Sequence, residues 1–77
     1  MVNLIELKLE RIRQGKTQAD VADGTSMSPT MYGQKERGET DMSVDEACEV
    51  ATSLELSDEK VLFIFFNRGL PIGNELR

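Results

Sequence analysis

The spacing of apolar residues along the chain predicts helices. Between residues 4 and 12, apolar side chains recur at intervals of three or four positions, which is the period of one face of an α-helix. The buried stripe expected here consists of Leu4, Ile5, Leu9 and Ile12, with Leu7 widening it. A second stripe is expected from Val44, Ala47, Cys48, Ala51 and Leu54. This placement makes Cys48 a small core residue.

Polar residues and glycines predict where the helices begin and end. The expected capping residues are Asn3, Thr17, Ser28, Ser43 and Ser57. Asn3 with Glu6 and Ser43 with Glu46 have the spacing of capping boxes. Gly15 and Gly38 are suited to the residue just after a helix. These signals divide the chain into five short helices and predict an all-α bundle.

The segment from residue 17 to residue 38 predicts two helices with a tight turn between them. We expect the first helix to run from Gln18 to about Asp23 and to fray at Gly24. The second is expected from Pro29 to about Arg37, because proline favours the first position of a helix. Met31 or Tyr32 should point inward from this helix, and Thr30, Gly33, Gln34 and Arg37 outward. Such a unit can place its second helix in the major groove of DNA.

The order of residues in this segment resembles the phage Cro/repressor-type helix-turn-helix family. The resemblance covers residues 4–56 and includes Arg11, Gly15, Thr17-Gln18, Asp20-Val21-Ala22, Met27-Ser28, Tyr32, Glu36 and Gly38. Short Cro-like phage regulators are the most similar group. The resemblance implies a five-helix, lambda-repressor-like DNA-binding fold and an ion pair between Arg11 and Glu36.

The resemblance also implies which residues contact DNA. Gln18 occupies the place of a glutamine that holds a phosphate, and Pro29, Thr30, Met31 and Gln34 occupy places where relatives read base edges. Glutamine can bind adenine with two hydrogen bonds, and threonine can contact the methyl group of thymine. Lys35, Arg37, Lys16 and Arg13 are candidates for phosphate contacts, with a solvated surface side chain as the alternative. The expected DNA-contacting set is Gln18, Ser28, Pro29, Thr30, Met31, Gln34, Lys35 and Arg37.

The turn departs from the family pattern. Thr25 stands where relatives have a large apolar residue, Ser26 stands where they have the turn glycine, and Gly24 comes early. Pro29 provides apolar contact only. We therefore expect a shifted or looser turn and a recognition helix poor in specific donors.

Residues 61–66, VLFIFF, form the longest apolar run. Six consecutive helical positions turn through about 600°, so they cannot all face one core. Two interpretations stay open: a dimer interface that includes Leu62, Phe65 and Phe66, which we favour, or a small core that wraps the run. Residues 1–68 are expected to form the helix-turn-helix domain and residues 69–77 an extended tail. Leu70 and Ile72 of the tail would pack on the fifth helix of the same or the partner subunit.

Composition and charge restrict the function further. The net charge is −5, but residues 1–40 are balanced and residues 41–77 carry three basic and eight acidic groups. The first half can therefore present a locally basic face. The chain has no histidine and one cysteine, which argues against imidazole catalysis, a zinc site and an internal disulfide. We expect no enzymatic activity, cofactor or metal.

Two functions stay open on these grounds. The first is a sequence-specific transcription regulator that binds double-stranded operator DNA as a homodimer. The second is a protein-interaction module on the same scaffold, resembling an antirepressor, that binds another phage regulator. The opening residues are not those of a signal peptide, and no apolar run is long enough for a membrane span, so we expect a cytoplasmic protein of a bacterial host cell.

Overall fold

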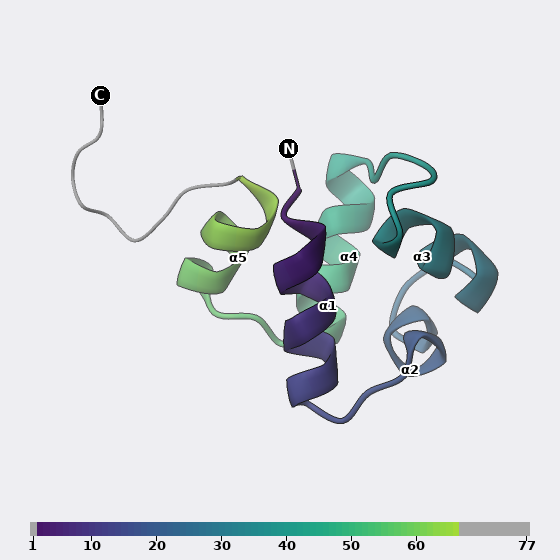
Figure 1. Ribbon diagram of the computed structural model, residues 1–77, viewed down its shortest axis with the longest axis horizontal. Helices are drawn as coiled ribbons and strands as arrows, with labels where there is room; N and C mark the ends of the chain where they lie inside the picture. Colours follow the sequence, from purple (N-terminus) through teal and green to yellow (C-terminus); the bar gives the residue numbers. More distant parts are fainter. Residues whose placement is uncertain (1, 67–77) are drawn as a thin grey trace.

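The computed structural model describes residues 2–66, and all regular secondary structure in this part of the chain is α-helix. The five helices are α1 (Leu4–Arg13), α2 (Gln18–Asp23), α3 (Pro29–Glu36), α4 (Val44–Ser53) and α5 (Asp58–Phe65) (Figure 1). The prediction of an all-α fold with five helices is confirmed. The expected tail over residues 69–77, with Leu70 and Ile72, lies outside the described residues.

Each helix begins where the capping residue predicts. The side chains of Asn3, Thr17, Ser28, Ser43 and Ser57 each accept a hydrogen bond from the backbone N–H three residues later. The box of Ser43 and Glu46 is reciprocal, as predicted. The box predicted at Asn3 is only half formed, because the Glu6 carboxylate contacts Arg13 at 3.0 Å instead.

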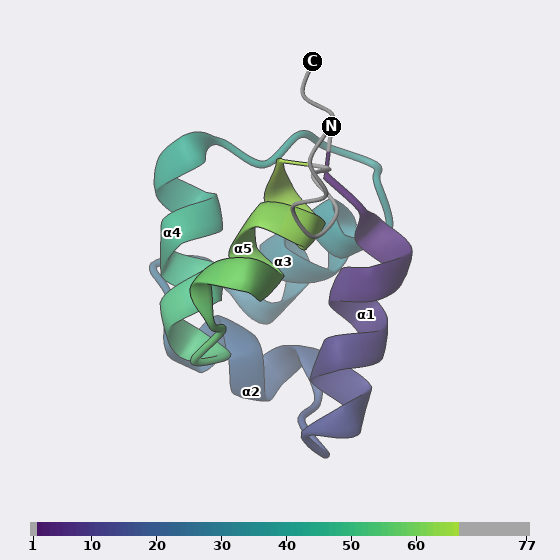
Figure 2. The same ribbon diagram turned by 90° about the vertical axis from the view of Figure 1, so that its left-hand side faces the viewer.

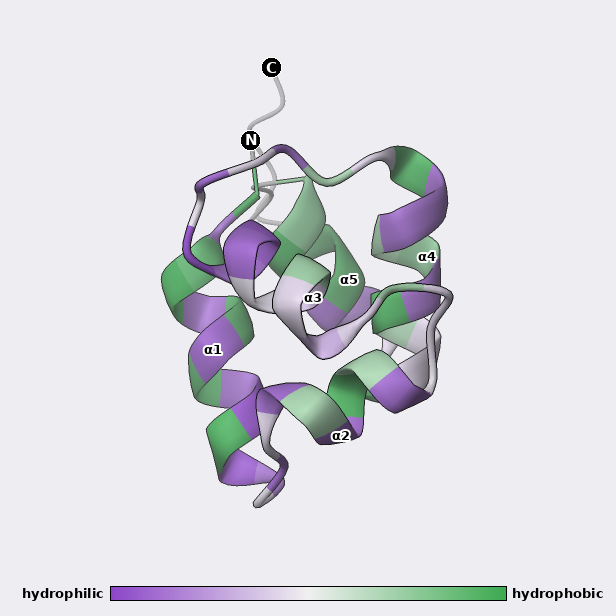
Figure 3. Cartoon of the chain, turned by 90° about the vertical axis from the view of Figure 1, so that its right-hand side faces the viewer, coloured by the Kyte–Doolittle hydropathy of each residue, from purple (hydrophilic) through white to green (hydrophobic). Residues whose placement is uncertain are grey.

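The helix-turn-helix pair and α5 lie on opposite sides of the molecule. In Figure 1 α2 and α3 are on the right and α5 is on the left, with α1 and α4 between them. Figure 2 has α5 in front of α3, and Figure 3, viewed from the other side, has α3 in front of α5. A partner that covers α5 therefore leaves α3 open.

The core draws on all five helices. It consists of Leu7, Val21, Ala22, Met27, Tyr32, Val50, Leu54, Ile64 and Phe65.

Gly15 and Gly38 follow α1 and α3 with φ angles of 71° and 84°, the left-handed region that favours glycine. No helix among residues 2–66 combines the length and apolar character needed to cross a membrane.

The face of α1 that packs inward differs from the predicted stripe. Leu7 is completely buried, whereas Ile5, Leu9 and Ile12 are 76%, 43% and 52% exposed. Apolar residues occupy two faces of α1, and the face with Leu7 and Arg11 meets the core. The prediction that Ile5, Leu9 and Ile12 form the buried stripe is wrong.

Two predicted placements near the C-terminal half also need correction. In the predicted stripe of α4, Cys48 is exposed and Val44 is 73% exposed, because the helix directs Val50 toward the core and leaves these two residues at the edge of a groove. On α5, Ile64 and Phe65 are buried, while Leu62 and Phe66 are 47% and 57% exposed. Phe65 therefore belongs to the core of its own subunit and is withdrawn from the expected dimer interface.

Candidate nucleic-acid interface

The turn between α2 and α3 is held by polar contacts. The Thr25 hydroxyl donates to the Ala22 carbonyl at 2.8 Å and accepts from the Met27 N–H at 3.0 Å. Ser26 donates through its N–H and its hydroxyl to Oε1 of Glu49 on α4, at 3.1 and 2.9 Å. The two residues that depart from the family pattern thus fix the turn, and the expectation of a looser turn is wrong.

Gly24 allows α4 to approach the end of α2. A Cβ atom at Gly24 would lie 2.5 Å from Oγ of Ser53, closer than real contacts allow. That hydroxyl donates to the Val21 carbonyl at 2.8 Å, so α2 and α4 are joined where the glycine ends the helix. The early glycine in the sequence therefore reflects a contact between helices.

A buried carboxylate joins α1, α2 and α3. Glu36 receives two hydrogen bonds from the Arg11 guanidinium, from Nε at 2.7 Å and from Nη2 at 3.0 Å. The Tyr32 hydroxyl donates to the same carboxylate at 2.9 Å, and Nε2 of Gln18 donates at 2.8 Å. Nη1 of Arg11 also donates to the Lys16 carbonyl at 2.8 Å. The structure places the expected pair of Arg11 and Glu36 in direct contact and adds two partners that sequence reasoning missed.

The ionisation of this network is set by burial and by its hydrogen bonds. Burial opposes ionisation of Glu36, but hydrogen bonds from Arg11, Gln18 and Tyr32 outweigh it and lower the pKa of this carboxyl. The hydrogen bond with Glu36 raises the pKa of Arg11. Burial, with the adjacent carboxylate, raises the pKa of the Tyr32 hydroxyl. Glu36 is therefore ionised and Tyr32 is a neutral donor at neutral pH.

The residues expected to meet bases lie on the open side of α3. Pro29 and Thr30 are exposed, Met31 is 43% exposed, and Gln34 is half-buried (Figure 3 views α3 from this side). Ser28 is exposed as well, although its hydroxyl caps the helix by accepting from the Met31 N–H at 3.1 Å. These side chains stand on a helix whose other face is fixed by Tyr32 and Glu36.

Gly33 points inward, contrary to the prediction. It is buried, and a Cβ atom there would lie 2.9 Å from Oε1 of Gln18 and 3.1 Å from Nη1 of Arg37. The small residue leaves room for Gln18 to cross α3 and reach Glu36. Its role is close packing between α2 and α3.

The candidate phosphate-binding cations already have partners within the chain. Lys35 turns toward α4 and the segment before it. Its Nζ atom lies 2.8 Å from the carbonyl oxygen of Asp41 and 3.3 Å from Oε1 of Glu46 on α4. Arg37 pairs with Glu39 at 2.8 Å. Arg13 pairs with Glu6 and Glu10, and Lys16 donates to the Ser53 carbonyl. A phosphate would have to displace these contacts.

Lys8 is a further candidate that sequence reasoning missed. It lines a hollow of about 420 Å³ together with Arg11, Gln18 and Arg37. Its side chain is exposed, and it has no ion pair among residues 2–66. The signal in the sequence was its position one helical turn before Arg11.

Comparison with known proteins gives one match. The family model described as "Helix-turn-helix" matches residues 7–61, which include α2, α3 and the Arg11–Glu36 pair. No curated protein and no solved structure matches the chain.

Proposed function

Because this chain belongs to the helix-turn-helix family of the Cro/C1 type and is a DNA-binding transcriptional regulator, we propose that it recognises a specific operator as a homodimer. The family has the lambda-repressor-like fold, as predicted, and is not enzymatic.

The observation that carries the proposal is the exposed side of α3. Thr30 presents a hydroxyl and a methyl group, and Gln34 presents an amide one helical turn later. In the major groove these groups suit thymine and adenine respectively. The network around Glu36 fixes the opposite face of the helix, so its orientation is set before DNA is bound.

Phosphate contacts would come from the edge where α1, α2 and α3 meet. The Gln18 amide has two N–H donors, and the structure commits one of them to Glu36, which leaves one for a phosphate. Lys8 and Arg37 line the same hollow. We propose Gln18, Lys8 and Arg37 as the phosphate contacts, and we leave out Lys35, whose ammonium is turned toward α4.

The dimer is proposed to form through α5. Leu62, Phe63 and Phe66 are exposed there, on the side of the molecule opposite α3 (Figure 1). Pairing through this face would leave both copies of α3 open. Two such helices about 34 Å apart would read half-sites separated by one turn of DNA.

Selection of duplexes from a randomised pool at low salt tests this function. We expect the wild-type protein to enrich a sequence with two related half-sites. The variant with both Thr30→Ala and Gln34→Ala should lose this enrichment, whereas Thr52→Ala, on the exposed side of α4, should keep it. Failure of the wild-type protein to enrich any sequence would contradict the proposal.

One observation favours a second function. The net charge is −5, and Arg13, Lys35 and Arg37 each pair with a carboxylate of the same chain, which weakens attraction to DNA. An antirepressor-like module would instead bind another regulator through its acidic surface or α5. Release of a purified repressor from its operator by this protein, without any shift of a duplex by the protein alone, would support this alternative.

A further inference from the structure

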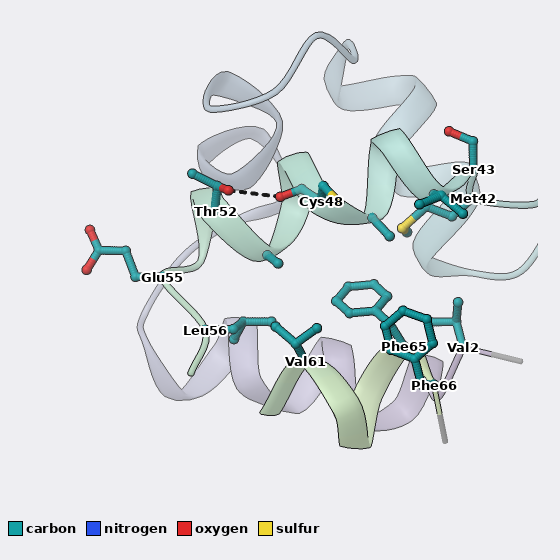
Figure 4. A pocket seen from close by; sticks show the side chains of 13 residues that line it. Val2, Met42, Ser43, Cys48, Thr52, Glu55, Leu56, Val61, Phe65 and Phe66 are labelled. Atoms are coloured by element: carbon teal, nitrogen blue, oxygen red, sulfur yellow. Dashed lines mark hydrogen bonds between the residues drawn. The ribbon is translucent and has the colours of Figure 1, made fainter. Parts of the chain in front are cut away.

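An apolar groove of about 620 Å³ runs between α4 and α5 (Figure 4). Its apolar lining includes Met42, Ala47, Ala51, Leu56, Val61 and Phe65. The hydroxyls in the lining are already used: Thr52 donates to the Cys48 carbonyl at 2.9 Å, and Ser43 caps α4. The groove therefore suits an apolar ligand that needs few hydrogen bonds.

The position of the groove points to residues that follow α5. Phe66, the last described residue, lines one end of the groove together with Val2 and Met42, and Leu56 and Glu55 lie toward the other end (Figure 4). Eleven residues follow Phe66, and their apolar side chains are Leu76 and the three consecutive residues Leu70, Pro71 and Ile72. A segment attached at the rim of a groove has a high effective concentration there.

We propose that the segment Leu70–Ile72 of the same chain occupies the groove between α4 and α5. The six residue steps from Phe66 to Ile72 reach at most about 20 Å, and α5, with its eight residues, is about 12 Å long. The segment can therefore turn back and follow the groove along α5. Gly69, just before the segment, suits such a turn.

The chemistry of the segment matches the lining. A groove between two helices offers no free row of backbone donors and acceptors, in contrast to the edge of a sheet. Proline has no N–H, so Pro71 removes one donor that the groove could not satisfy, and it favours an extended backbone. Occupation by the same chain covers Val61 and Phe65, while Leu62 and Phe63, outside the groove lining, stay open to a second copy.

Cys48 makes the proposal testable, because it lines the groove and is the only cysteine in the chain. In the 77-residue chain, Ile72→Cys and, separately, Leu70→Cys are oxidised under non-reducing conditions. We expect at least one of them to form a disulfide with Cys48 within a single chain, seen as a monomer without free thiol. Arg77→Cys is the matched control and should form this disulfide much more slowly.

The reactivity of Cys48 toward a thiol reagent is the second measurement. The double variant Leu70→Ser/Ile72→Ser should react several-fold faster than the wild-type chain, and Asn74→Ser should react like the wild type. Equal rates for the double variant and the wild type would overturn the proposal. A disulfide that joins two chains would also overturn the proposal and would assign the groove to a second copy. If neither Leu70→Cys nor Ile72→Cys forms a disulfide with Cys48, the segment lies outside the groove and the proposal is wrong.

Discussion

At the scale of single residues, Glu36 determines how α3 is held. Its carboxylate accepts hydrogen bonds from Arg11 on α1, Gln18 on α2 and Tyr32 on α3. Family resemblance predicted the pair with Arg11. It did not predict the other two partners, because sequence spacing does not reveal which side chains converge after folding. Gly33 illustrates the same limit: its packing against Gln18 depends on two helices meeting.

Removal of the Tyr32 hydroxyl tests the network. Tyr32→Phe should lower the free energy of unfolding by about 1.5–3 kcal/mol, the usual range for a hydrogen bond to a charged group. Urea unfolding at neutral pH measures this loss. Thr30→Ala, which changes an exposed hydroxyl on the same helix, is the control and should cost much less. Equal stabilities of Tyr32→Phe and wild type would show that the network does not support α3.

The contribution of the Glu36 carboxylate to stability depends on pH in a definite direction. The pKa of Glu36 is lower in the folded protein than the ordinary value of about 4.3, so its contribution to stability is complete above that value. The contribution is lost as the pH falls from there through the lower folded pKa. Titration of the Glu36 carboxyl by NMR should give a midpoint below about 4.3, and Tyr32→Phe should raise it. A midpoint above that value in the wild type would contradict the account.

At the scale of elements, the sequence was most informative about the ends of helices. Capping depends on residues three positions apart, so Thr17 and Ser28 placed α2 and α3 correctly. The buried face of α1 could not be assigned in this way, because Leu7 and Ile5 are both apolar and only packing against other helices distinguishes them. The prediction of a looser turn between α2 and α3 was wrong for a similar reason, because Glu49, which holds this turn, lies on α4.

Gly24→Ala tests the contact between α2 and α4. The added methyl group would collide with Oγ of Ser53, and overpacking of this kind typically costs about 1–3 kcal/mol. Denaturant unfolding of Gly24→Ala, Ser53→Ala and the double variant measures the coupling. We expect the double variant to be more stable than the sum of the single changes predicts, because Ser53→Ala removes the atom that collides. Additive losses would contradict this explanation.

At the scale of the whole molecule, α3 and α5 lie on opposite sides, which would leave both copies of α3 open in the proposed dimer (Figures 1 and 3). The apolar run at residues 61–66 indicated that some side chains must lie outside the core, and Leu62 and Phe66 do. Periodicity alone did not show that Phe65 faces inward. A charge at Phe65 would therefore disrupt the fold, and Leu62 is the better probe of association.

Leu62→Glu should convert the proposed dimer to a monomer, because two carboxylates would face each other across the interface without partners. Sedimentation of the variant and the wild type at the same concentration measures the change. Ile5→Glu replaces an apolar residue on α1 that is 76% exposed, against 47% for Leu62, and should leave the dimer intact. Two monomeric profiles for wild type and Leu62→Glu would refute the dimer.

Titration of the enriched duplex with wild-type protein and with Gln34→Ala tests whether the open side of α3 reads DNA. We expect the substitution to weaken binding by about 1–3 kcal/mol, or roughly 5- to 150-fold, and to relax preference at one base position. Thr52→Ala should bind like the wild type. Equal affinities of wild type and Gln34→Ala for the enriched duplex, with unchanged base preference, would contradict the claim.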